Sequence, residues 1–381
     1  MDLILDDIYP AGDQAFDSRH LRPLASLNRR QVIALPAADP AWVGRRGWEL
    51  LSKHALADLV GARVKTLGLD GVDPANYPLR LNECLDSADA LLWLTAEAIA
   101  AEFGRRLGCL VASLLLSPAG LSDPLTAWEA AYLDYWHKQV RHIFLGGGHA
   151  SGRLGPLIAR AAQEALKECG VAGYTFQAAH APAWLPLIGA GRTLPIGSVP
   201  IGSVPVDCRG AAVLFDCGGT RAKRGIAFYD AQGALVELRR LPEVDIAGVI
   251  TRGTPLELAQ AMLGVMVETI QAVPAGVELA RPVTVSVASY VKDGQPLKIN
   301  RDAYSCLGQV AADLPAWFAE HIQAACGSAA PAVQVKFMHD GEAAACALAG
   351  QPQAAVIMLG SALGVGFVPP AEGFRESKLL F

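Results

Sequence analysis

The sequence predicts an α/β protein of two lobes. The chain has 381 residues, more than one compact domain usually contains. Short apolar runs with strand character alternate along it with stretches of helical periodicity. Three of the apolar runs end in glycine-rich turns, at 146–148, 216–220 and 360–366. Hydrophobic residues make up 52% of the chain and charged residues 18%, which is enough apolar material for large cores.

Charge and composition exclude several classes of protein. The net charge of −5 gives no electrostatic footprint for nucleic acid or an anionic membrane. No apolar run approaches the roughly 20 residues of a membrane span, and the acidic start "MDLILDD" is unlike a signal peptide. The eight cysteines are scattered without a Cys-x-x-Cys pair, which argues against structural zinc and fits a reducing compartment. We therefore expect a cytoplasmic protein that binds neither nucleic acid nor membrane.

The first half of the chain is predicted to be mainly helical. Residues 1–40 are irregular and broken by prolines. Helical periodicity then covers three ranges, about 48–62, 84–116 and 127–140. The segment "HIFLGGG" is a short buried strand that ends in three glycines. "PLIARAAQEALKECG" is a helix with Pro156 in its first turn and Gly170 just past its end. "YTFQAA" predicts another strand, and "LPLIGAGR" a further turn or helix.

A tandem repeat separates the two halves. The pentapeptide Ile-Gly-Ser-Val-Pro occurs twice in residues 196–205, and such a composition fits neither a helix nor a central strand. We interpret 196–208 as a linker. Strands dominate from there to about Arg240, followed by a helix over "PLELAQAMLGVMVETIQAV". "VTVSVAS" is a buried strand, "DLPAWFAEHIQAACG" a helix, "VQVKFMHDGEAAACALAG" a strand running into a helix, and "AAVIMLGSALGVGFV" a closing hairpin.

The glycine turn after the linker has strands on both sides, unlike a P-loop or a Rossmann turn, which lead into a helix. Gly218 and Gly219 allow the backbone to approach an anion, Thr220 adds a hydroxyl and Lys223 a positive charge. Asp216 would repel a bare phosphate, so it makes sense beside a magnesium ion or its waters. Taken alone, the stretch is equally compatible with an ordinary hairpin whose Asp-Cys-Gly-Gly caps a turn.

Five segments together resemble the superfamily of actin, hexokinases, heat-shock chaperones and sugar kinases, most closely the ROK-type (repressor/ORF/kinase) sugar kinases. "DCGGTRAKRGIAFYDAQG" is similar to the first phosphate motif of that family, and "VTVSVASYVKDGQPLKIN" to its first-lobe strand and substrate loop. "VKFMHDGEAAACALAG" resembles the segment with the catalytic aspartate, and "VIMLGSALGVGFV" the second phosphate hairpin. "HIFLGGGHASGRLGPLIARAAQEAL" resembles the adenosine motif. The resemblance implies a two-lobed ribonuclease H-like (actin-like ATPase) fold.

The order of these segments departs from the family. There the adenosine motif comes last, whereas here it precedes the first phosphate motif, which implies a circularly permuted chain joined through the pentapeptide repeat. Permutation is tolerated where chain ends lie close together at the surface. The nucleotide lobe is then expected to combine residues 1–195 with 353–381, and the substrate lobe to span 209–350.

The resemblance also implies roles for single residues. Asp340 would be the base that accepts a proton from the attacking hydroxyl, although an aspartate there is also a good helix N-cap. His339 stands where the family has an asparagine that contacts the substrate, Asn300 belongs to the substrate loop, and Asp216 would hold magnesium. The expected ATP contacts are Gly218, Gly219, Thr220, Lys223, Gly360, Ser361, Gly364, Gly146, Gly147 and Gly148.

The sequence thus predicts an ATP- and magnesium-dependent phosphotransferase acting on a hydroxyl of a sugar or a similar small polar metabolite. The alternative is a nucleotide-binding regulatory or assembly protein of the same fold without turnover. The alternative is favoured by a missing feature, since the family's His-x-Gly-His and cysteine-rich zinc segment does not follow the second phosphate hairpin. An ATPase or acyl-phosphate kinase also stays open, as does assembly into a homodimer.

Overall fold

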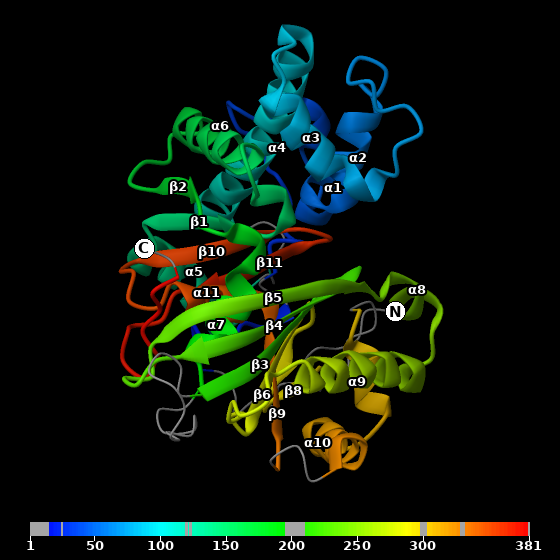
Figure 1. The fold of residues 1–381 in the computed structure, drawn as a ribbon. Helices are drawn as coiled ribbons and strands as arrows, with labels where there is room; N and C mark the ends of the chain where they lie inside the picture. Colours follow the sequence, from blue (N-terminus) through cyan, green and yellow to red (C-terminus); the bar gives the residue numbers. More distant parts are fainter. Residues whose placement is uncertain are drawn as a thin grey trace. The chain divides into compact units, whose positions relative to one another are not determined.

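The structure is a computed structural model that describes residues 15–23, 26–118, 121, 124–194, 210–297, 303–327 and 332–379. Figure 1 shows its helices and strands. Their contacts divide the chain into two compact units. Of the described residues, unit 1 comprises those in Trp184–Gln351 and Val368–Phe381, and unit 2 comprises those in Ile4–Ala183 and Pro352–Phe367. Each unit holds a β-sheet with helices packed on it, so the predicted α/β class is confirmed.

Unit 1 is built on a five-stranded sheet, among the described residues, in the order β5-β4-β3-β6-β9. β3 (Gly210–Cys217), β4 (Arg221–Tyr229) and β5 (Leu235–Asp245) form an antiparallel meander. β6 (Pro282–Val287) and β9 (Gln334–His339) continue the sheet parallel to β3. An antiparallel meander continued by two parallel strands is the ribonuclease H-like arrangement that the resemblance implied.

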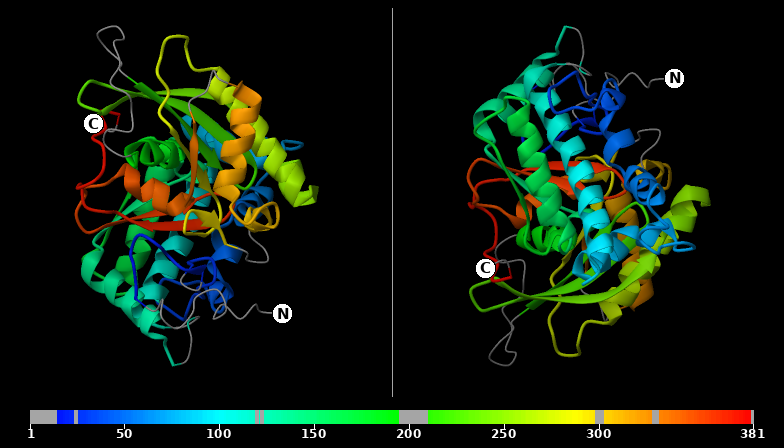
Figure 2. Two further views of the ribbon diagram at one scale, coloured as in Figure 1. Left: turned by 90° about the horizontal axis from the view of Figure 1, so that it is seen from below. Right: turned by 90° about the horizontal axis from the view of Figure 1, so that it is seen from above.

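Four helices of the described residues pack on this sheet: α7 (Leu185–Arg192), α9 (Pro255–Gln271), α10 (Leu314–Cys326) and α11 (Asp340–Ala347). The short helix α8 (Ala247–Arg252) contacts α9. α9 and α10 run side by side over one face (Figure 2). The core beneath them contains Val213 and Phe215 of β3 with Met262 and Phe318. Successive strand residues point to opposite faces, so Asp216, which lies between Phe215 and Cys217, faces away from this core.

α11 is held by unusually close backbone contacts. A Cβ on Gly189 of α7 would overlap the carbonyl oxygen of Ala343 on α11, so α7 approaches α11 as only glycine allows. The buried Arg192 side chain then donates from Nη1 to the Ala347 carbonyl at 2.6 Å and from Nη2 to the Ala349 carbonyl at 3.1 Å. These bonds satisfy carbonyl groups at the end of α11, which intrahelical bonds leave unpaired.

This contact gives a first prediction. Gly189→Ala should lower the melting temperature of unit 1, because the new methyl group forces α7 and α11 apart, and overpacking of this kind costs about 1–3 kcal/mol or more. Gly264→Ala on α9 is the matched control: nothing lies within 4 Å of its Cβ position, so better helix propensity should stabilise the protein slightly. Scanning calorimetry of the two variants measures the difference, and equal melting temperatures would disprove the tight contact.

Unit 2 is built on a four-stranded sheet, among the described residues, in the order β11-β10-β1-β2. β1 (His142–Gly146) lies parallel between β2 (Thr175–Ala178) and β10 (Ala354–Leu359), and β11 (Leu363–Phe367) forms a hairpin with β10. β1 thus pairs with a strand more than 200 residues further along the chain. The permutation itself stays a prediction.

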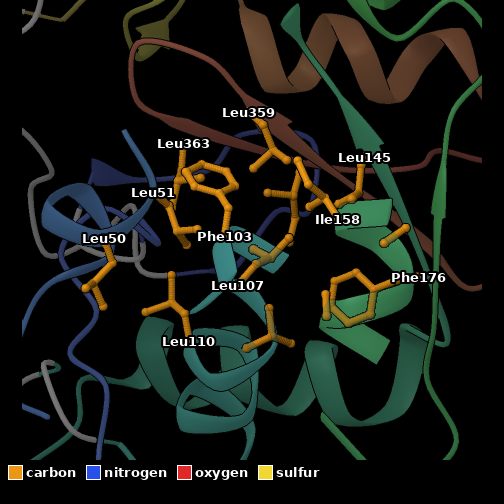
Figure 3. Close-up of a cluster of buried hydrophobic side chains, with 14 of the residues drawn as sticks. Leu50, Leu51, Phe103, Leu107, Leu110, Leu145, Ile158, Phe176, Leu359 and Leu363 are labelled. Carbon is orange, nitrogen blue, oxygen red and sulfur yellow. The ribbon is translucent and has the colours of Figure 1, made fainter. Parts of the chain in front are cut away.

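The helices of unit 2 are α1 (Gly47–Leu51), α2 (Lys53–Gly61), α3 (Tyr77–Asp86), α4 (Ala90–Leu116), α5 (Ala127–Gln139) and α6 (Leu154–Glu168). The predicted helix over 84–116 is therefore two helices, because Asp89 caps a new start. Figure 3 shows Phe103 and Leu107 of α4 packed with Ile158 of α6 and Leu359 of β10 in one core. Within the described residues, no helix combines the length and the apolarity needed to cross a membrane.

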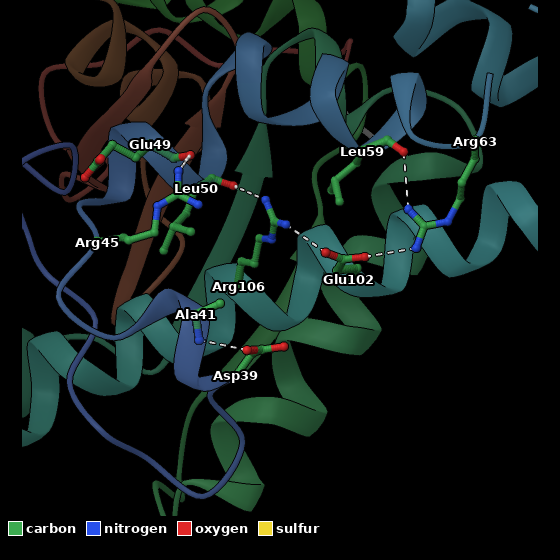
Figure 4. Close-up of polar contacts among 9 residues, drawn as sticks. All are labelled: Asp39, Ala41, Arg45, Glu49, Leu50, Leu59, Arg63, Glu102 and Arg106. Atoms are coloured by element: carbon green, nitrogen blue, oxygen red, sulfur yellow. Dashed lines mark hydrogen bonds and ion pairs between the residues drawn. The ribbon is translucent and has the colours of Figure 1, made fainter.

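Polar contacts attach the N-terminal segments to this core. The Asn28 side chain both donates to the Leu363 carbonyl at 2.6 Å and accepts from the Leu363 amide at 2.8 Å, which joins it to β11. Glu102 on α4 binds Arg106 at 2.7 Å and Arg63 at 3.3 Å (Figure 4). The predicted irregular start of the chain is thus ordered where it is described, through bonds to distant residues.

The lobe boundaries predicted from the sequence stay a prediction. By their contacts, α7 and the described part of Val368–Phe381 group with unit 1. The reason is a pair of buried arginines: Arg192 on α7 donates to the Arg375 carbonyl at 2.7 Å, and Arg375 donates to the Gly233 carbonyl at 2.9 Å. The predicted linker 196–208 lies outside the described residues.

Candidate functional site

The register of unit 1 places three polar side chains together. Asp216 on β3 lies opposite Lys223 on β4 and beside Ser286 on β6. Lys223 Nζ is 2.9 Å from Asp216 Oδ2, and the Ser286 hydroxyl donates to Asp216 Oδ1 at 3.3 Å. The side chain of Asp216 is 5% exposed and that of Lys223 20%. Both carboxylate oxygens of Asp216 are therefore engaged by neighbouring strands.

Asp340 lies where β9 passes into α11, and β9 is the strand next to β6. His339 Nε2 lies 3.2 Å from Asp340 Oδ1, and the Gly341 amide donates to the same oxygen at 2.7 Å. The ring of Tyr290 stacks on that of His339 with centroids 4.7 Å apart. The N-cap of α11 is His339, so the alternative in which Asp340 is the N-cap is not what the structure shows.

The charges of these groups act on one another. Burial raises the pKa of Asp340 to about 7, and the nearby Asp216 carboxylate adds to this increase, while the Gly341 amide and Lys223 partly oppose it. Burial lowers the pKa of Lys223, but the carboxylates of Asp216, Glu243 and Asp340 outweigh it and leave a net increase. A carboxyl group whose pKa lies near neutral pH is suited to acid–base chemistry.

The raised pKa of Asp340 predicts how stability depends on pH. An exposed aspartate titrates near 3.8, whereas Asp340 titrates near 7 in the folded protein. Between these pH values the folded state keeps a proton that the unfolded state has lost. The contribution of Asp340 to the free energy of unfolding is therefore highest at low pH and falls as the pH rises toward 7. Asp340→Asn has no such group, so its melting temperature should improve relative to wild type between pH 5 and 8. A constant difference over that range would contradict the raised pKa.

The first glycine turn is tightly folded. The Gly218 amide donates to the Arg221 carbonyl at 3.0 Å, and the Tyr304 hydroxyl donates to the Gly218 carbonyl at 2.7 Å. The Thr220 carbonyl accepts from the Ile246 amide at 3.1 Å. Gly218 therefore stabilises the turn with its own amide, and contact with a phosphate through that amide would require the turn to open.

In unit 2 the structure brings two predicted glycine loops together. Gly146 ends β1, paired with Met358 of β10. Gly147 has a φ of +89°, and a Cβ there would overlap the Leu359 backbone, so this glycine permits direct contact between the two loops. Nothing lies within 4 Å of the Cβ positions of Gly148 and Gly360. Both loops follow the carboxyl ends of parallel strands, where open α/β sheets bind ligands.

The remaining predicted residues lie as follows. Ser361 is in the turn between β10 and β11, and Gly364 is inside β11, paired with Met358. Asn300 lies outside the described residues. Sequence reasoning missed Ser286 and Tyr304; the alternating pattern of "VTVSVAS" marks Ser286 as sharing a face with Thr284, but only the register shows that it reaches Asp216. Among the described residues, no group of three or more His, Cys, Asp or Glu is placed to hold a metal ion.

Comparison with known proteins gives limited matches. No protein-family model matches the chain, and no curated protein matches its sequence. Two solved structures of the Aquifex aeolicus Ppx/GppA enzyme, one of them described as a phosphatase, match at 13% and 11% identity over 34% and 35% of this chain, each with a TM-score of 0.20. The match spans only 36% and 37% of those chains. An exopolyphosphatase-like protein matches at 12% identity over 68% of this chain and 83% of its own, with a TM-score of 0.27.

These likenesses carry no argument about activity, because their identities and TM-scores are low. None of them places the chain in the ROK family.

Proposed function

We propose that the protein is a phosphotransferase that transfers a phosphoryl group from ATP to a hydroxyl of a sugar or a similar small polar metabolite, with its acid–base chemistry in unit 1. The observation that supports this most is Asp340. Its carboxyl group has a pKa raised to about 7, and its side chain is 22% exposed, so it is desolvated but still open to contact. A general base works best when its pKa lies near the working pH.

The surroundings of Asp340 orient the carboxyl group for this role. His339 and Gly341 both bind Oδ1, so Oδ2 is the oxygen that would accept a proton from the acceptor hydroxyl. Tyr290 stacks on His339 and limits the rotation of its ring. Arg192 holds the far end of α11 and thereby the helix that begins at Asp340. Positioning of this kind, rather than covalent chemistry, is what phosphoryl transfer requires of a protein.

The residues do not fit a magnesium ion bound directly to Asp216. Oδ2 is paired with the Lys223 ammonium and Oδ1 accepts the Ser286 hydroxyl, so the position of a cation is already taken by a positive charge. Magnesium generally keeps several waters and binds through substrate phosphates as well as one or two carboxylates. We therefore assign Asp216 no step in the reaction. The glycine loops of unit 2 keep their proposed role in binding ATP.

The second candidate is a nucleotide-binding protein without turnover, which the closed turn at Gly218 and the Asp216–Lys223 pair favour. ADP release from Mg-ATP across a panel of sugars and polyols, together with calorimetric ATP binding, separates the two. ADP formation that depends on an acceptor supports the phosphotransferase. Tight ATP binding without acceptor-dependent ADP supports the second candidate, and the absence of both contradicts both.

A further inference from the structure

The ion pair of Asp216 and Lys223 is built into the sheet rather than formed by two long surface side chains. The two residues are directly opposite each other in the β3–β4 register, with Ser286 on the other side of Asp216. The carboxylate is almost completely buried, and the ammonium lies 2.9 Å from Oδ2. Because the backbone pairing fixes all three positions, separating the charges would require the Lys223 side chain to leave its place against the sheet.

The negative charges around Lys223 stabilise the protonated form of its side chain. Asp216 is its direct partner, and the carboxylates of Glu243 and Asp340 also attract the ammonium. Without the lysine, Asp216 would keep the Ser286 hydroxyl as a side-chain partner, with the Asp340 carboxyl group close enough to interact with it electrostatically. Hard oxygen ligands of this kind are the ones that bind divalent cations such as Mg²⁺ and Mn²⁺.

We propose that Lys223 is the resident cation of this site and takes the position that a divalent metal would otherwise occupy at Asp216. Asp216 then binds a divalent ion only when the charge of the ammonium group is removed. The proposal does not rest on the phosphotransferase activity, since it concerns the free protein and a metal probe alone.

The test is binding of Mn²⁺ to the full chain without nucleotide. Binding is measured by electron paramagnetic resonance as the loss of the free-ion signal. Wild type should leave the signal unchanged, and Lys223→Met should bind Mn²⁺ at least about tenfold more tightly, because a nearby positive charge has gone. Adding Asp216→Asn to Lys223→Met should abolish that binding. Lys378→Met is the matched control: it breaks another lysine–aspartate pair of unit 1, with Asp230 at 2.7 Å, and should create no metal site.

Two results would overturn the proposal. One is Mn²⁺ binding by wild type that disappears in Asp216→Asn, since the carboxylate would then hold a metal despite Lys223. The other is a folded Lys223→Met variant that binds no Mn²⁺. If the methionine variant does not fold, Lys223→Gln replaces it, because glutamine keeps a hydrogen-bond donor without the charge, and it should bind Mn²⁺ in the same way. The comparison of wild type with Asp216→Asn needs no lysine variant, and Mn²⁺ binding by wild type that depends on Asp216 is enough to reject the proposal.

Discussion

Replacing Asp340 by asparagine should lower acceptor-dependent ADP formation by about 10²–10⁴-fold, the range in which a general base contributes to a rate. Asparagine keeps the size of the side chain and can still bond to His339, but it cannot accept the proton of an attacking hydroxyl. ATP affinity should stay within a few-fold of wild type, because the variant removes an interaction that matters in the transition state. Initial rates and calorimetry on the same preparation measure both quantities.

Glu342→Gln provides the control for this variant. Glu342 lies in the same first turn of α11, so the substitution also removes a negative charge near the helix N-terminus. It should leave turnover largely intact. If Asp340→Asn keeps wild-type turnover and both variants lose only a little stability, Asp340 merely stabilises the first turn of α11. The assignment of Asp340 as the catalytic base is then wrong.

The second large effect concerns the stability of the Asp216–Lys223 pair. Lys223→Met should destabilise the fold by about 3–5 kcal/mol, because it leaves a buried carboxylate without its partner. Adding Asp216→Asn should recover most of this loss, since a neutral pair has no uncompensated charge. Denaturant unfolding of wild type, both single variants and the double variant gives the coupling free energy.

The exposed pair of Lys378 and Asp230 sets the scale for comparison. The Lys378 side chain is 61% exposed, so Lys378→Met should cost no more than about 1 kcal/mol. A loss of that small size for Lys223→Met as well, or a double variant less stable than either single one, would show that the buried pair is not coupled as its geometry indicates.

The sequence predicts the β3–β4 hairpin because its glycines stand between two apolar runs, and it predicts the start of α11 near Asp340 because a strand pattern changes there to a helical one. It does not predict the partner of Lys223. That lysine was expected to contact a phosphate, whereas the register places it opposite Asp216. Which residues face one another across a hairpin depends on the number of residues in the turn, and a shift of one residue moves each side chain to the other face.

The contacts of Arg192 could not be predicted for a related reason. Arg192 is the last residue of an apolar helix, where a basic side chain commonly lies in solvent. In the structure it is buried and donates to three carbonyl groups, those of Ala347, Ala349 and Arg375. These bonds join residues that lie 155 to 183 positions apart in the chain. The pattern of neighbouring residues in the sequence carries no information about contacts at such a separation.

Titration of the Asp340 carboxyl group itself tests most directly whether Asp340 acts as the base. Carbon-13 NMR of aspartate-labelled protein, with Asp340→Asn to assign the resonance, follows its protonation across the pH range. We expect a midpoint near pH 7, because burial and the Asp216 carboxylate both oppose ionisation. A midpoint near 3.8, the value of an ordinary aspartate, would contradict the assignment of Asp340 as a base poised for proton transfer at neutral pH.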